Sequence, residues 1–296
     1  MNRGARAAGA LRTALVIGGL AVAAVIVLKL AVPALEPRLA FFPRRDLVRS
    51  PKALGLPFED FTVRAADGVV LHGWFIPGAA RGTQPAAAHR PLTILLFHGN
   101  GENIGDGLAI APPVRQAGWN LLLLDYRGYG RSEGMPSEQG IYADGATALA
   151  ALRLRDDVDP ERIVLWGRSI GTAVAVHLAA AGPVRGVILE SPFTSAAELL
   201  RASGAWALYA LARFGTYRFD SAGKMAGVRV PVLVIHGTDD EVVPFALGRR
   251  LHDLVPGRRE FLAIEGGGHN DLLLRHGDAL WAGAHRFLAT LETGTD

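Results

Sequence analysis

The chain has 296 residues, half of them hydrophobic, which is long enough for one large α/β domain with an additional segment. It contains no cysteine, and this excludes disulfides, thiol catalysis and cysteine-ligated zinc. The net charge is only +3 and the arginines are scattered rather than clustered with aromatic residues, so nucleic acid is not expected as a partner.

The N-terminal segment is strongly apolar. Residues 13–28 carry no charge, and Lys29 is the only charged residue between Thr13 and Glu36. Counted through Leu35, the run reaches the ~20 residues that a helix needs to cross the hydrocarbon core of a bilayer. Lys29 is long enough to extend its ammonium group toward the far interface. The run therefore predicts a membrane-spanning helix.

A cleaved signal peptide is the alternative for this segment. The apolar region of a signal peptide is usually ~7–15 residues long, and "LAVPALEP" contains no convincing small-x-small cleavage site. We therefore expect residues 1–36 to be a tail and an uncleaved single-pass anchor, followed by a linker over residues 37–55. Because arginines lie on both sides of the span, their distribution gives only a weak signal for its orientation. The short N-terminal tail favours an orientation with the tail inside and the domain extracytoplasmic.

From residue 56 to 296, apolar runs alternate with segments of helical length. Runs such as "LTILLF" and "VLVI" are typical of parallel strands covered on both faces. The expected strands are Phe61–Ala65, Val69–Ile76, Leu92–His98, Asn120–Asp125, Arg162–Trp166, Gly186–Glu190, Val232–His236 and Arg259–Ile264. The expected helices are Glu102–Gln116, Glu138–Leu154, Ile170–Ala181, Ala196–Arg213, Phe245–Leu254 and Asp271–Leu291. This alternation predicts a mostly parallel sheet with helices on both sides, and ligands bind such sheets beyond the carboxyl ends of the strands.

The fifth expected strand is followed directly by "GRSIG", residues 167–171, and then by a helix. This is the G-x-S-x-G pattern of a nucleophile elbow in the context that the elbow requires. A serine on so sharp a turn has a strained backbone, and a side chain at either glycine would collide with a neighbouring strand or helix. We therefore expect Ser169 to be the catalytic nucleophile.

A serine hydroxyl needs a base and an orienting acid, in the chain order Ser, Asp or Glu, His. "HGTDDEVVP" follows the seventh strand and supplies Asp240 as the expected acid, with Asp239 as the alternative and Glu190 as a further candidate. "GGGHND" follows the eighth strand and supplies His269 as the expected base. No other histidine lies on a glycine-rich loop after the last strand. Six others are interpreted as structural because they fall within expected strands or helices or, for His89, in a polar loop; the five within strands or helices are His72, His177, His252, His276 and His285.

The remaining requirement is a pair of donors for the oxyanion that forms during acyl transfer. One donor is expected to be the backbone N–H of Ile170, directly after the serine. The other lies on the loop after the third strand, "HGNGEN", where we expect the backbone N–H of Asn100.

These motifs, together with "DYRGYGRSEG" and "ESPFTS", resemble the α/β-hydrolase superfamily, particularly its membrane-anchored α/β-hydrolase-domain serine hydrolases. The resemblance covers about residues 56–291. It implies an eight-stranded, mostly parallel sheet with an antiparallel second strand, and Ser169, Asp240 and His269 as the triad. It further implies hydrolysis of a carboxylic ester or thioester, including a lipid or an acylated protein, without metal or other cofactor. Only residues 191–230 separate the sixth and seventh strands, so at most a small helical cap is expected there.

Two other functions are compatible with parts of the sequence. A serine peptidase of the same fold would use the same residues. A dinucleotide-binding oxidoreductase would use Gly99 and Gly101, but its third glycine should stand at position 104, which is isoleucine, and the run follows the third strand rather than the first. We therefore favour a serine hydrolase.

Overall fold

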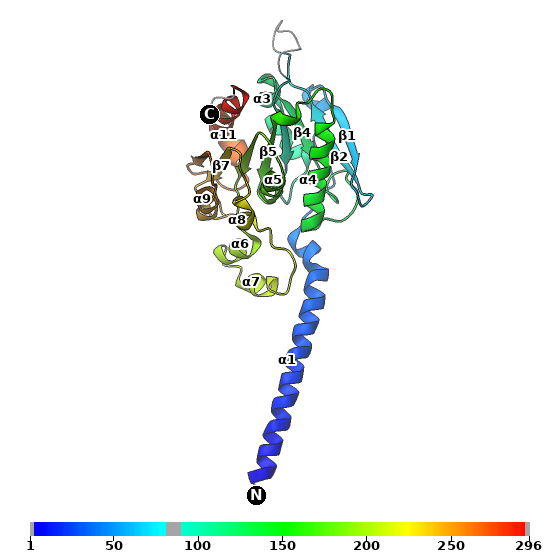
Figure 1. Ribbon diagram of the computed structural model, residues 1–296, viewed down its shortest axis with the longest axis vertical. Coiled ribbons are helices and arrows are strands. Elements are labelled where there is room, and N and C mark those ends of the chain that lie inside the picture. Colours follow the sequence, from blue (N-terminus) through cyan, green and yellow to red (C-terminus); the bar gives the residue numbers. More distant parts are fainter. Residues whose placement is uncertain (1–2, 81–89, 294–296) are drawn as a thin grey trace.

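A computed structural model describes residues 3–80 and 90–293, with side chains from residue 15 onward. It consists of an eight-stranded sheet between two layers of helices, with a long N-terminal helix that projects away from the domain (Figure 1). The strands are β1 Glu59–Arg64, β2 Val70–Ile76, β3 Thr93–Phe97, β4 Asn120–Leu124, β5 Ile163–Arg168, β6 Gly186–Glu190, β7 Val232–Gly237 and β8 Arg259–Ile264.

The strands are arranged in the order β1-β2-β4-β3-β5-β6-β7-β8. Strand β2 is antiparallel to both of its neighbours, and every other neighbouring pair is parallel. The expected α/β-hydrolase fold and its antiparallel second strand are therefore confirmed.

Helices cover both faces of the sheet. The α-helices are α1 Arg3–Ala40, α2 Ile104–Gly107, α3 Ala111–Gln116, α4 Glu138–Arg153, α5 Ile170–Ala181, α6 Ala196–Ala202, α7 Trp206–Ala212, α8 Ser221–Met225, α9 Phe245–Asp253, α10 Leu272–Arg275 and α11 Gly277–Thr293. Short 3₁₀ turns occupy Pro51–Leu54, Leu108–Ile110 and Pro160–Arg162.

Strand β4 shows why the strand sequences are continuously apolar. Leu122 and Leu124 pack with α4 and α5 on one face, whereas Leu121 and Leu123 pack with α3 and α11 on the other. Successive side chains of a strand point to opposite faces, so a strand covered on both sides carries apolar residues in an unbroken run rather than in alternation.

Three expected helices are divided in the structure. The expected helix 102–116 is broken into α2, a 3₁₀ turn and α3, because Pro112 and Pro113 open α3 and cannot donate hydrogen bonds to the preceding turn. The expected helix 196–213 becomes α6 and α7, separated at Gly204, whose φ of +74° is left-handed. The third, 271–291, is α10 followed by α11, and α8 was not expected.

Helix α1 is apolar and mostly exposed until its last turns. Its segment Leu15–Ala40 contains an 18-residue window with a mean hydropathy of 2.7 and is long enough to cross a membrane. Near its end, Val32 and Glu36 are buried against the domain. The Glu36 carboxylate accepts hydrogen bonds from the Thr216 N–H and hydroxyl, each at 2.7 Å, and from the Tyr217 N–H at 3.1 Å. The end of α1 is thus fastened to the loop that follows α7.

The segment after α1 also packs on the domain. Phe41 is buried, and the Asn103 side chain donates hydrogen bonds to the carbonyl oxygens of Arg44 at 3.3 Å and Asp46 at 2.9 Å. The chain therefore runs along the domain surface toward β1.

Candidate active site

The turn between β5 and α5 holds Ser169 in a strained conformation, with φ of 51° and ψ of −117°. The two flanking glycines leave no room for a side chain. A Cβ on Gly167 would overlap the carbonyl oxygen of Gly171, and a Cβ on Gly171 would overlap the carbonyl oxygen of Phe97 in β3. The turn is held in place by the Ser169 N–H, which donates to the Glu190 carbonyl at 2.9 Å.

Three side chains from separate loops form one chain of contacts. The Oγ of Ser169 lies 3.1 Å from Nε2 of His269. The Nδ1 of His269 lies 2.8 Å from Oδ2 and 3.0 Å from Oδ1 of Asp240. Both His269 and Asp240 are buried. The structure therefore brings the three sequence-predicted residues together at the carboxyl ends of β5, β7 and β8.

The two alternative acids do not reach His269. Asp239 is exposed, and its carboxylate accepts a hydrogen bond from the Thr238 hydroxyl at 3.3 Å. Glu190 is buried, and its carboxylate contacts the Trp166 indole at 3.3 Å and Arg168 at 3.2 Å. Burial raises the pKa of the Glu190 carboxyl, and the nearby Arg168 opposes that rise only partly.

The Asp240 carboxylate is held in its ionised form. Burial by itself would raise the pKa of Asp240, but hydrogen bonds from His236, His269 and the Val243 N–H together lower that pKa well below its usual range. The Val242 N–H donates to Oδ1 at 3.0 Å and the Val243 N–H at 2.7 Å. Asp240 is therefore a carboxylate across the neutral range, with its orientation fixed by the backbone.

Sequence reasoning did not identify His236 as part of the site. Its Nε2 lies 2.9 Å from the Val243 carbonyl oxygen, which can only accept, so Nε2 carries a proton. The same Nε2 lies 3.3 Å from Oδ2 of Asp240. The only signal in the sequence was its place at the end of β7, four residues before Asp240.

The loop after β3 is fastened around Asn100. The Asn100 side chain donates to the Ala40 carbonyl at 2.8 Å, and its oxygen accepts from the Phe42 N–H at 3.2 Å and from the Tyr129 hydroxyl at 2.8 Å. The backbone N–H groups of Asn100 and Ile170 have no hydrogen-bond acceptor within residues 3–80 and 90–293. Both residues line the same cavity as Ser169. These N–H groups are therefore free to receive a ligand oxygen.

Arg168, the residue before the serine, links three loops of the site. Its guanidinium pairs with the Glu102 carboxylate and donates to the His269 carbonyl at 3.1 Å. Glu102 in turn accepts the Gly99 N–H at 2.7 Å. Burial would lower the pKa of Arg168, but Glu190 and Glu102 raise it. Because these contacts join residues 66 and 101 positions apart, no local pattern could have predicted them.

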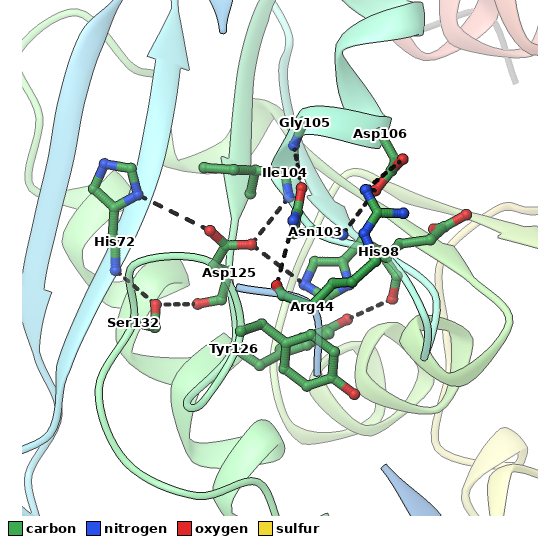
Figure 2. A network of polar contacts seen from close by, with 12 residues as sticks. Arg44, His72, His98, Asn103, Ile104, Gly105, Asp106, Asp125, Tyr126 and Ser132 are labelled. Carbon is green, nitrogen blue, oxygen red and sulfur yellow. Dashed lines mark hydrogen bonds and ion pairs between the residues drawn. The ribbon is translucent and has the colours of Figure 1, made fainter. Parts of the chain in front are cut away.

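A second buried polar cluster lies beside the loop after β3 (Figure 2). Asp125 accepts the Ile104 N–H at 3.0 Å, with the His98 Nε2 at 3.7 Å and the His72 Nδ1 at 4.0 Å from its two oxygens. The backbone carbonyl of Asp125 accepts the Ser132 hydroxyl at 2.8 Å. The side chains of His72, His98, Asp125 and Ser132 do not line the cavity at Ser169. The cluster therefore anchors the start of α2.

Ser169 and His269 open onto a cavity of about 1010 Å³. This volume is at the upper end of the range of ~300–1,000 Å³ that is usual for small-molecule sites. Its walls are largely apolar and come from the end of α1, α6, α7 and α10. Among them are Val32, Leu39, Leu199, Leu208, Leu211 and Leu273. Within the described residues, no group of three or more His, Asp or Glu side chains is arranged to hold a metal ion.

Comparison with known proteins is consistent with this architecture. Residues 93–230 match the family model described as alpha/beta hydrolase fold. The chain is 32% identical over 293 residues to the alpha/beta hydrolase domain-containing protein WAV2 of Arabidopsis thaliana, and the match covers 92% of each chain. The chain belongs to the α/β-hydrolase family. A relative from Mycobacterium tuberculosis, described as an uncharacterised protein, is 36% identical over 253 residues, which cover 86% of this chain and 87% of the relative.

Solved α/β-hydrolase structures share the fold at low identity. The Pyrococcus furiosus esterase Pf2001 matches with a TM-score of 0.69 and 19% identity, covering 84% of this chain and 97% of the esterase. An esterase from Exiguobacterium antarcticum matches with a TM-score of 0.60 and 16% identity, covering 78% of this chain and all of the esterase. At these identities the comparison bears on the fold alone. The dinucleotide-binding alternative requires its glycine loop after the first strand of the sheet, whereas Gly99 and Gly101 follow β3.

Proposed function

We propose that this α/β hydrolase is a serine hydrolase that cleaves a carboxylic ester or thioester through an acyl-enzyme intermediate. The observation that carries the proposal is the continuous contact from Ser169 through His269 to Asp240, on a strained strand-to-helix turn. The names of the structural neighbours that are esterases give independent support for ester chemistry.

The proposed mechanism follows from the contacts. The Nδ1–H of His269 donates to the ionised Asp240, which leaves Nε2 free to accept the Ser169 proton. The serine oxygen attacks the acyl carbon, and the oxyanion receives hydrogen bonds from the N–H groups of Ile170 and Asn100. His269 then protonates the leaving alcohol or thiol. Water, activated by the same imidazole, releases the acid and restores Ser169.

A fluorophosphonate probe tests the proposal directly, because it forms a covalent bond with an activated serine. Trypsin cleaves after Arg168 and Arg185, and residues 169–185 contain a single serine, Ser169. We expect the full-length protein to be labelled and the adduct to be found by mass spectrometry on this peptide. An unlabelled protein, or an adduct confined to another serine, would contradict the proposed nucleophile.

We also propose that residues 1–36 are a tail and an uncleaved single-pass anchor, that residues 37–55 are a linker, and that the hydrolase domain, residues 56–296, is extracytoplasmic. The exposed apolar surface of α1 from Leu15 to Leu30 supports an anchor. The burial of Val32 and the contacts of Glu36 with residues 216–217 support the proposal that the anchor is not cleaved from the domain. Removal of α1 would also remove Val32, Glu36 and Leu39, which line the cavity at Ser169.

The expected result is a mature protein that keeps its N-terminal segment and stays with the membrane after a carbonate wash. Protease added to right-side-out vesicles should degrade the domain, since it is proposed to lie outside. A soluble mature chain that begins after residue 28 would instead identify the segment as a cleaved signal.

A further inference from the structure

The cavity at Ser169 has an exposed rim of large apolar side chains. Single exposed apolar residues are ordinary on a protein surface, but a contiguous group marks an interaction site. Here the exposed residues line one cavity and come from α1, α7, α10 and the loops between elements. We call these six residues the rim: Leu39, Phe42, Val48, Leu208, Val242 and Leu274.

Helix α7 extends this apolar surface. Its sequence, WALYALA, contains no charge, and Trp206 at its start is 62% exposed with its ring edge-on to Tyr209. Figure 1 shows α6 and α7 at the end of the domain from which α1 projects. The Glu36 contacts with residues 216–217 join α1 to the loop directly after α7. The rim and α7 therefore lie beside the C-terminal end of α1.

The length of α1 indicates where a bilayer surface would lie. From Leu15 to Leu35 the helix rises ~30 Å, which equals the thickness of a hydrocarbon core. A bilayer spanned by these residues ends next to Glu36, at the level of α7. Exposed arginines surround that level, at positions 38, 201 and 213, and tryptophan and arginine are the residues favoured at a lipid interface.

From this arrangement we propose that the cavity opens toward the bilayer and that its substrate is a long-chain acyl ester of a membrane lipid. The inference rests on the proposed function. The lipid reaches Ser169 sideways between α1 and α7, with its acyl chain against the apolar walls. The ester C–O bond breaks, water supplies the hydroxyl of the released fatty acid, and the lipid alcohol takes up a proton. Arg44 and Arg49 also line the cavity, but its exposed rim is apolar and lies beside the end of α1, where a bilayer surface is expected, so a lipid is favoured over an acylated protein.

The test uses the full-length protein in phosphatidylcholine vesicles with monopalmitoylglycerol, and p-nitrophenyl acetate in solution as reference. We expect Trp206→Asp and Leu208→Asp each to lower palmitate release by about tenfold relative to acetate release, because a charge at the interface opposes lipid contact. The control is Leu154→Asp, since Leu154 is 85% exposed and lies outside the cavity. That variant should keep the wild-type ratio.

Each alternative outcome has a defined meaning. Acetate release without palmitate release, or equal ratios in all variants, would overturn the membrane-facing cavity and leave the serine hydrolase standing. Faster turnover of an S-palmitoylated peptide than of monopalmitoylglycerol in the same vesicles would identify an acylated protein instead. Failure to hydrolyse any ester, without fluorophosphonate labelling, would overturn the proposed function itself.

A spectroscopic measurement tests the position of α7 without any activity. Trp206 is exposed, whereas Trp74, Trp119 and Trp166 are buried in the domain core and Trp281 in α11 is partly buried against it. Vesicles of brominated phosphatidylcholine should therefore quench the fluorescence of the wild-type protein mainly at Trp206. We expect Trp206→Phe to lose most of that quenching. Equal quenching in the wild type and in this variant, or none in either, would overturn the proposed contact.

Discussion

Replacing Ser169 by alanine is expected to lower kcat for short p-nitrophenyl esters by about 10⁴- to 10⁶-fold. The variant lacks the oxygen that would attack the acyl carbon, while His269 and the N–H groups of Ile170 and Asn100 stay in place. Alanine is expected to fit the turn, because the positive φ at position 169 strains an alanine about as much as it strains the native serine. The loss is measured in steady-state kinetics of full-length protein in detergent.

Ser203→Ala provides the matched control for this prediction. Ser203 is exposed after α6, and within the described residues its hydroxyl donates only to the Leu200 carbonyl, at 3.3 Å. We expect its kinetics to match the wild type. If Ser169→Ala kept a kcat within a few fold of the wild type while remaining folded, the covalent mechanism would be wrong.

The sequence was sufficient to predict the residues that meet at the carboxyl ends of the strands. Ser169 follows β5 directly, Asp240 and His269 lie on the loops after β7 and β8, and the topology of such a sheet brings those strand ends to one edge. Gly167 and Gly171 added a local signal, because each lies against backbone that excludes a Cβ. The distances between the three side chains, however, come only from the structure.

The parts that could not be predicted depend on contacts distant in sequence. Arg168 and Glu102 are charged residues on loops, and only the fold shows that they join the elbow to the His269 loop. Glu36 was interpreted as the polar end of an apolar run, because nothing local indicates a partner 180 positions away at Thr216. The breaks within expected helices were missed for a different reason, because local signals such as Pro112, Pro113 and Gly204 were outweighed by an apolar periodicity that continues across them.

The Asp240→Asn variant is expected to lower kcat by about 10⁴-fold, although an amide has nearly the same shape as a carboxylate. The Val242 and Val243 N–H groups bind Oδ1, so the asparagine oxygen should take that position and its NH₂ group should face His269. An NH₂ group can only donate, which forces Nδ1 of His269 to accept and places the proton on Nε2. His269 then cannot remove the Ser169 proton.

Asp239→Asn, one residue away, is the matched control. Asp239 is exposed and makes no contact with His269 in the described residues, so its kcat should change by less than about twofold. Circular dichroism should show that both variants are folded, which assigns any kinetic difference to the hydrogen bond at Nδ1. Losses of similar size in the two variants, or a large loss in Asp239→Asn alone, would show that Asp240 is not the residue that orients His269.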